Sequence, residues 1–187
     1  MTLVSESLSA TAVAPTTVLE SAFLAMLDDF DARGPHNTEF YAPARVDFAA
    51  YVQGLKDEEA GVNLPDGFVP CTHRWLVTGA GAVAGVTRLR HSIGTPFLAQ
   101  SGGHVGYDVA PSYRGRSLGH LALATALAEA RRIGLGAVLL YTGEDNAPSR
   151  ATIERAGGVL EGIAYSEFWQ EPLCKYWITV PAPDLGP

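Results

Sequence analysis

Apolar and polar positions in the first third of the chain follow helical spacing. Between Val18 and Phe30, apolar side chains recur every three or four residues, and residues 45–59 repeat this pattern. The spacing predicts two amphipathic helices that each bury one face. Residues 34–37 between them (Gly-Pro-His-Asn) are typical of a turn. Residues 1–15 are rich in Ser, Thr and Ala and are expected to form a mobile lead-in.

Further along the chain the apolar period shortens to that of β-strands. Two more helices are predicted at residues 118–133 and 147–157, because glycines end each of their apolar stripes. Six strands are predicted, at residues 74–77, 83–91, 103–109, 137–142, 158–166 and 175–180. This order indicates one α/β domain with a mixed sheet over residues 16–180, followed by a tail at 181–187.

The composition is that of a globular protein. The 187 residues are 47% hydrophobic and 18% charged, and the formal net charge is −7 at pH 7. This charge argues against a nucleic-acid partner and favours cationic small-molecule or peptide partners. No apolar run approaches the ~20 residues of a membrane span, and the N-terminus lacks the features of a signal peptide. We therefore expect a cytoplasmic protein that binds neither nucleic acid nor a membrane.

The cysteines and histidines give no pattern of metal ligands. Cys71 and Cys174 are too far apart for a metal knuckle or a disulfide framework, and none of the five histidines is paired with another at i, i+4. The sequence therefore indicates a metal-free protein in a reducing compartment.

A glycine-rich segment at residues 79–84 resembles a dinucleotide-binding fingerprint but lacks its context. That fingerprint needs a following helix and an acidic residue about 20 positions on. Here residues 83–89 alternate like a strand, and no Asp or Glu occurs between Gly67 and Tyr107. A hairpin turn is the better interpretation. In the strand that follows, Arg88 and Arg90 share one side, so that face is expected to be wet.

The strongest signal for a ligand site lies at residues 106–119. A strand ends at Pro111, and a loop with Arg114 and Arg116 leads into a helix. Amides at the start of a helix are unpaired, the helix dipole adds positive potential, and the arginines add full charges. Such a loop is suited to a diphosphate. An ordinary strand-to-helix turn with two solvated arginines is the alternative.

With this loop the sequence resembles the GNAT superfamily of acyl-CoA-dependent N-acyltransferases, in a bacterial branch, over roughly residues 19–180. The positions that match the family signature are Arg114, Ser117 and Gly119 in the loop and Asn146, Ser149 and Gly157 around the next helix. Ser117 stands where the first signature glycine is usual. The resemblance implies a mixed α/β sheet with helices on both faces and a central V-shaped splay between two parallel strands.

The resemblance also implies acetyl-CoA as the cosubstrate, without a metal. Its pantetheine would lie between the strands that end near Val109 and Thr142, and an N–H near Val109 would polarise the thioester carbonyl. The coenzyme A-binding residues implied are Val109, Arg114, Gly115, Arg116, Ser117, Leu118, Gly119, Asn146 and Ser149. Asn146 would reach the pantetheine, and a plain helix cap is the alternative because Asn is a preferred cap.

Many GNAT enzymes carry a tyrosine that protonates the leaving thiolate, and here Ile153 occupies its position. The role of general acid would fall to Tyr165, to Tyr107, to water, or to no group. Because thiolates are good leaving groups, the absence of this tyrosine does not exclude activity.

The resemblance places the general base on the strand before the loop, where His104 stands. A bulge before Pro111 would turn His104 toward the thioester, and its imidazole titrates near neutrality. A structural partner of a nearby backbone group is the alternative for His104. Glu144 and Asp145 are candidates for holding a cationic amine, with solvated loop acids as the alternative.

These expectations point to an N-acetyltransferase that moves an acetyl group from acetyl-CoA to a primary amine of a small molecule or peptide. A non-catalytic acyl-CoA-binding sensor or partner module is the alternative, favoured by the missing tyrosine and the altered glycine. A homodimer is a further option, because the C-terminal strands of GNAT proteins often make dimers. The sequence does not encode the identity of the acceptor.

Overall fold

The computed structural model describes residues 8–33 and 39–182 and contains two antiparallel sheets. The first sheet has the order β1-β2-β3-β4, and the second has the order β5-β7-β6. The strands are β1 (Ala10–Val13), β2 (Cys71–Thr78), β3 (Val83–Arg90), β4 (Val105–Val109), β5 (Ala137–Gly143), β6 (Val159–Ser166) and β7 (Glu171–Thr179). No helix in the described part of the chain is long and apolar enough to cross a bilayer.

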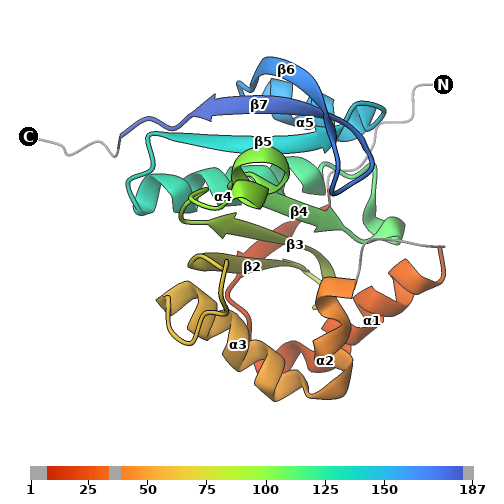
Figure 1. Ribbon diagram of the computed structural model, residues 1–187. Helices are drawn as coiled ribbons and strands as arrows, with labels where there is room; N and C mark the ends of the chain where they lie inside the picture. The colour runs from red at the N-terminus through yellow and green to blue at the C-terminus, as the bar shows by residue number, and fades with distance from the viewer. Residues whose placement is uncertain (1–7, 34–38, 183–187) are drawn as a thin grey trace, which may run out of the picture.

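Helices cover both faces of the first sheet, as expected. Figure 1 shows α1, α2 and α3 together at the end of the molecule next to β2, and the second sheet at the opposite end. The helices are α1 (Glu20–Asp31), α2 (Ala42–Val46), α3 (Phe48–Ala60), α4 (Leu118–Arg132) and α5 (Ala147–Arg155). In β2, Trp75 packs with the α1–α3 group, whereas its neighbour Leu76 packs with Leu118 and Ala122 of α4. The pleat of the strand thus sends successive side chains to opposite layers.

An aromatic cluster fixes the α1–α3 group on the sheet. The ring of Phe23 in α1 lies 4.5 Å from that of Trp75 and 5.6 Å from that of Phe48 in α3. The start of α3 is set by Asp47, whose Oδ1 accepts a hydrogen bond of 2.9 Å from the Ala50 amide. This cap separates α2 from α3 and positions the inner face of α3 over β2.

The two sheets meet at the start of β4 and diverge from there. The His104 amide, just before β4, donates to the Leu139 carbonyl of β5 at 2.7 Å, and the Leu139 amide donates to His104 Nδ1 at 2.9 Å. Beyond this point β4 and β5 lie in different sheets and share no ladder, and every strand pairing of the described residues is antiparallel. The splay is therefore present without a parallel ladder between its two strands.

Several details differ from the sequence-based expectations. Ala10–Val13, assigned to a mobile lead-in, form β1 and pair with Trp75–Thr78 of β2. The single helix expected at 45–59 is two helices, because Asp47 has extended backbone angles and caps the second. The hairpin turn expected at residues 79–84 is confirmed, with Gly81 at φ 83° between β2 and β3. The turn at 34–37, residues 1–7 and most of the tail, 183–187, lie outside the described residues.

The His104 contact generates a stability prediction. Replacing His104 by Ala leaves the buried Leu139 amide without an acceptor, and we expect the free energy of unfolding to fall by about 1–3 kcal/mol. His104→Asn, whose side-chain oxygen can accept the same bond, should lose less. Urea denaturation of the three proteins measures the difference. Equal destabilisation by Ala and Asn would contradict a role for the hydrogen bond.

Candidate functional site

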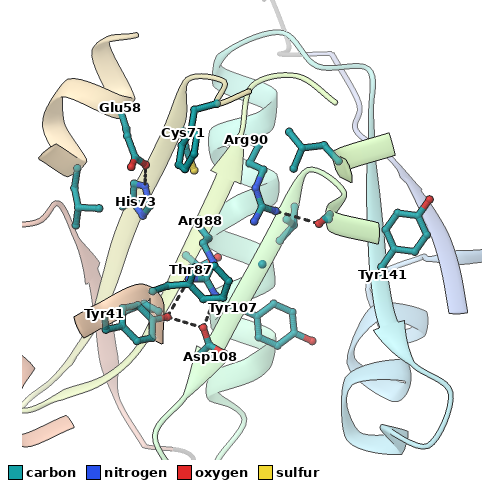
Figure 2. A pocket seen from close by; sticks show the side chains of 18 of the residues that line it. Tyr41, Glu58, Cys71, His73, Thr87, Arg88, Arg90, Tyr107, Asp108 and Tyr141 are labelled. Atoms are coloured by element: carbon teal, nitrogen blue, oxygen red, sulfur yellow. Dashed lines mark hydrogen bonds and ion pairs between the residues drawn. The ribbon is translucent and has the colours of Figure 1, made fainter. Parts of the chain in front are cut away.

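A cavity of about 1260 Å³ runs through the splay from α5 to the inner face of the α1–α3 group. At one end it is lined by Asn146 and Ser149, and at the other by Tyr51 and Leu55 of α3. Figure 2 shows the labelled side chains of β2, β3 and β4 turned toward this space. One continuous cavity therefore reaches both faces of β4, the edge strand of the first sheet that borders the splay.

Backbone groups of β4 and β5 that take no part in a strand ladder line the splay. The Arg90 amide donates to the His104 carbonyl and the Ala110 amide to the Ala84 carbonyl, so even-numbered residues of β4 bond to β3. Because antiparallel ladders alternate, the N–H and C=O groups of Val105, Tyr107 and Val109 point away from β3 into the gap. The same alternation, set by the pairing of β5 with β7, turns the backbone of residues 139, 141 and 143 toward the gap from the other side. An extended ligand can thus bond to both strands.

The loop between β4 and α4 presents amides at the start of a 15-residue helix. Ser117 precedes α4 in a left-handed conformation, with φ 64°, and its side chain caps no amide of the helix. The amides of Leu118 and Gly119 fall in the first turn, where a helix offers no internal acceptor. Arg114 Nε donates to the Val109 carbonyl at 3.1 Å, which ties the loop to the end of β4. Because glycine adopts a positive φ without strain, this conformation accounts for the glycine that the family signature has where this chain has Ser117.

The loop is anchored on α1. The Asp29 carboxylate accepts hydrogen bonds from the Ser112 amide at 2.8 Å and from the Ser112 hydroxyl at 2.6 Å. Burial opposes ionisation of Asp29, but the hydrogen bonds from Ser112 outweigh it and lower the pKa of the carboxyl. A short helical turn at Pro111–Tyr113 follows β4 and carries this contact.

At the other side of the splay, α5 presents Asn146 and Ser149 to the cavity. Asn146 Oδ1 accepts a hydrogen bond of 3.1 Å from the Ser149 amide, so the residue is a helix cap. This bond uses the side-chain oxygen and leaves the amide nitrogen as a donor. Ser149 Oγ lies 2.9 Å from the hydroxyl of Tyr107, which crosses the gap from β4. Ile153, one turn further along α5, is buried.

Tyr107 is the one expected general-acid candidate that reaches the cavity. Burial raises the pKa of its phenol, and hydrogen bonding with Ser149 and Thr152 lowers it by less. Thr87, directly opposite Tyr107 in the β3–β4 ladder, has a buried hydroxyl with no partner among the described residues. Tyr165 lies instead on the edge strand β6, is 56% exposed and does not line the cavity.

The position of His104 favours the structural alternative. The β3–β4 register is continuous from Leu89–Val105 to Gly85–Val109, so the bulge that would turn His104 toward the thioester is not present. Its Nδ1 already accepts the Leu139 amide, and it does not line the cavity. Burial, with Arg90 nearby, lowers the pKa of its imidazole.

The two expected amine-binding acids lie outside the cavity. Glu144 and Asp145 occupy the exposed turn between β5 and α5, and neither lines the cavity. The Glu144 amide donates to the Pro172 carbonyl, and its carbonyl accepts from Arg150 at 3.1 Å. Their positions fit solvated loop acids.

A charged network on the cavity wall was not identified from the sequence. Arg88 forms an ion pair with Asp108 across the β3–β4 ladder, and its Nη1 donates to the Tyr41 hydroxyl at 3.1 Å. Tyr41 in turn donates to Asp108 at 2.6 Å, as Figure 2 shows. Burial raises the pKa of Tyr41, so the phenol stays protonated. The sequence offered one indication of this network, namely that Arg88 and Arg90 share one side of their strand. That side was expected to face open solvent, but it lines the cavity.

A second cluster of polar side chains lies near the start of β2. His73 Nε2 lies 2.7 Å from Glu58 Oε2, and one ligand atom each from Glu58, Cys71 and His73 falls within 4.8 Å of the others. Burial lowers the pKa of His73, but hydrogen bonds to Cys71 and Glu58 outweigh it and raise the value to about 9. These three groups could hold a divalent ion, although His73 is already paired as a cation and the guanidinium groups of Arg88 and Arg90 oppose a further positive charge.

A family model described as the acetyltransferase (GNAT) family matches residues 20–158 of the chain. No curated protein matches the sequence.

Several solved structures share the fold at low sequence identity. The microcin self-immunity acetyltransferase MccE, in complex with acetyl-CoA and AMP, is 14% identical, with 91% of this chain and 92% of that chain covered at a TM-score of 0.67. Mycobacterium smegmatis RimJ, with a coenzyme A disulfide, is 17% identical over 91% and 81%, with a TM-score of 0.67. The ribosomal alpha-N-protein acetyltransferase RimL, in complex with coenzyme A, is 18% identical over 96% and 98%, with a TM-score of 0.66. At these identities the likeness concerns the fold alone.

The left-handed residue before α4 generates a second stability prediction. A side chain at φ 64° is strained by about 1–2 kcal/mol, whereas glycine adopts this conformation freely and loses about 0.5–1 kcal/mol in chain entropy. We expect Ser117→Gly to raise the free energy of unfolding by about 0.5–1 kcal/mol. Ser117→Ala, which keeps the strain, should bring no gain. Thermal or urea denaturation measures both, and a loss of stability in the glycine variant would contradict the strain.

Proposed function

The chain belongs to the GNAT acetyltransferase family, and we propose that it moves the acetyl group of acetyl-CoA to a primary amine of a small molecule or peptide. The observation that carries this proposal is the continuous cavity through the splay. A thioester bound in the gap and an amine bound beside the α1–α3 group would meet inside this cavity, with no protein segment between them.

Acetyl-CoA would bind in two parts. Its diphosphate would lie on the amides of Ser117, Leu118 and Gly119, where the dipole of α4 and the guanidinium groups of Arg114 and Arg116 favour an anion. Its pantetheine would pair with the inward-facing backbone of β4 and β5. The Val109 amide points into the gap, which suits it to polarise the thioester carbonyl. The free amide nitrogen of Asn146 would donate to the pantetheine.

The transfer needs a neutral amine and a proton for the leaving thiolate. The neutral amine attacks the acetyl carbonyl, the new C–N bond forms, the C–S bond breaks, and the coenzyme A thiolate takes a proton. Tyr107 is suited to supply this proton because its phenol faces the gap, stays protonated at neutral pH and contacts Ser149, one turn of α5 before Ile153. It would regain a proton through solvent from the acceptor nitrogen, which becomes cationic when the C–N bond forms and must lose a proton to give the amide. Tyrosine from β4 would thus replace the tyrosine that the family carries on α5.

Two features favour the alternative of a non-catalytic acyl-CoA-binding module. Ser117 strains the diphosphate loop, and Ile153 replaces the usual acid. Both functions require binding of acetyl-CoA, but only the enzyme would transfer its acetyl group to an amine. One set of measurements of binding and transfer therefore separates them.

Binding of acetyl-CoA and release of free thiol with a panel of primary amines test the proposal. Acetyl-CoA should raise the Tm by mass action, and at least one amine should release coenzyme A thiol. Ser117→Asp should abolish the rise in Tm, because a carboxylate would stand against the diphosphate. Ser92→Asp, at an exposed serine away from the loop, is the matched control and should keep the rise. Binding without thiol release from any amine would establish the non-catalytic module instead.

Removal of the Tyr107 hydroxyl tests the acid. Tyr107→Phe should lower kcat by about 10²-fold, within the range of general-acid contributions, with little change in acetyl-CoA binding. Because burial raises the pKa of this phenol above its usual value near 10, its deprotonation should cause no fall in wild-type kcat below about pH 9. Tyr165→Phe on the exposed edge strand is the control and should leave kcat unchanged. A fall in kcat for Tyr165→Phe and none for Tyr107→Phe would assign the acid to β6.

A further inference from the structure

Arg90 presents a guanidinium group to the cavity without an acidic partner. Its Nη1 donates to the Gly102 carbonyl at 3.0 Å and the Gly103 carbonyl at 3.2 Å. Figure 2 shows the Arg90 side chain, with a dashed line that leaves its guanidinium group. No carboxylate forms an ion pair with it among the described residues, and its Nε and Nη2 have no hydrogen bond there. The two carbonyl bonds fix the plane of the group and leave its other edge open. That edge is the fork that binds a carboxylate through two parallel hydrogen bonds.

The acids around Arg90 are committed to other groups. Glu58 of α3 is paired with His73 of β2 at 2.7 Å, and Asp108 of β4 is paired with Arg88 and accepts from Tyr41. A cation withdrawn from water is unfavourable unless an anion or strong acceptors replace its hydration. The two carbonyl oxygens that accept from Arg90 replace only part of the hydration of its guanidinium group.

Two further acids line the cavity, at positions that leave Arg90 unpaired. Asp47 is exposed, and its Oδ1 caps α3 through the Ala50 amide. Glu171 stands at the first residue of β7, where its carboxylate lies beside Gly143 at the far end of β5. Burial and the neighbouring Arg88 both lower the pKa of Arg90, although nearby Cys71 and Glu58 raise it. Arginine nevertheless stays charged at any physiological pH.

We propose that Arg90 binds a carboxylate of the acceptor, so that the substrate is an amino acid rather than a simple amine. The substrate class rests on the proposed acetyl transfer, whereas the anion site does not. A single open guanidinium edge matches one monoanion, which favours a carboxylate over a phosphate dianion.

The walls around this edge indicate the rest of the molecule. Aromatic and aliphatic side chains surround the acceptor end of the cavity, namely Phe40, Tyr51, Leu55, Phe68, Phe97 and Trp169. Apolar walls around one fixed charge are typical of a site in which a polar anchor sets orientation and apolar contact supplies affinity. An amino acid with an aromatic or aliphatic side chain therefore fits this end of the cavity best.

Matched pairs of acceptors test the inference in the wild-type protein. Phenylalanine, tyrosine, leucine and methionine are each compared with their decarboxylated amines and with their carboxamides in the thiol-release assay. Each accepted amino acid should have a kcat/KM at least about 10-fold above that of its two uncharged counterparts, because a charged hydrogen-bonded pair is worth at least that factor. Equal rates for amino acid and amine would overturn the proposal.

Substitution of Arg90 locates the effect. Arg90→Gln should raise KM for the amino acid about 10-fold or more with little change in kcat, and should leave the kinetics of the amine unchanged. Arg90→Lys should retain part of the preference because it keeps the charge. Arg155→Gln, at an exposed arginine in the last turn of α5, is the control and should match wild type. A parallel loss for amino acid and amine in Arg90→Gln would contradict carboxylate binding.

Direct binding separates this inference from the proposed function. Phenylacetate and its neutral analogue phenylacetamide are titrated into the protein without acetyl-CoA, and the shift in Tm is followed. Phenylacetate alone should raise the Tm, and Arg90→Gln should remove that rise, with each shift measured against the Tm of the same unliganded variant. Binding that depends on Arg90, with no acetyl transfer to any amine, would overturn the proposed function and retain the anion site. Transfer without carboxylate preference or phenylacetate binding would overturn the anion site alone.

Discussion

The contact between His104 and Leu139 is the constraint on which the rest of the site depends. Two hydrogen bonds join the start of β4 to β5 at this point, and a ring nitrogen takes the place of a backbone acceptor in one of them. Because a side chain completes the contact, the ladder stops there and the strands separate. The alternate backbone groups that follow on both strands then face the gap outside any strand ladder, which is unfavourable unless water, a side chain or a ligand bonds to them. The proposed pantetheine site is therefore built mainly from main chain.

The sequence predicted the order of elements well, because period and glycine positions are local signals. The strands that were predicted, α4 and α5 lie close to their expected ranges, and the expected loop does lead from β4 into α4. Its role in holding a diphosphate stays a prediction. The prediction of a mobile lead-in was wrong at residues 10–13, because β1 is only four residues long and is stabilised by pairing with β2. The paired residues are 62 to 68 positions apart in the sequence, and no local pattern reports such a contact. The prediction of one long helix at 45–59 was wrong for a local reason. The side chain of Asp47 caps α3 and so ends α2 before it.

The polar wall of the cavity could not be predicted, because its members come from distant parts of the chain. Tyr41 and Asp108 are 67 positions apart and meet only because α1, α2 and α3 pack on the face of β3 and β4 that carries Arg88. An alternating strand tells which residues share a side, but not whether that side faces bulk water, a cavity or a helix. His104 shows the same limit. Its expected role required a bulge, and the regular register of β4 leaves its ring at the junction of the sheets instead.

Local pairing, rather than net charge, decides what the cavity can bind. The chain carries a formal charge of −7, which by itself favours cationic partners, yet a field summed over the whole surface is screened within about 10 Å at 0.1 M ionic strength. Inside the cavity the relevant quantity is which charge remains without a partner. Glu58 and Asp108 are neutralised by His73 and Arg88 at hydrogen-bonding distance. Asp47 and Glu171 also line the cavity, at positions that leave Arg90 unpaired, and the proposed anchor for an anion is therefore the guanidinium of Arg90. An acidic protein can thus hold a cationic recognition point, because the acids nearest to it are already paired.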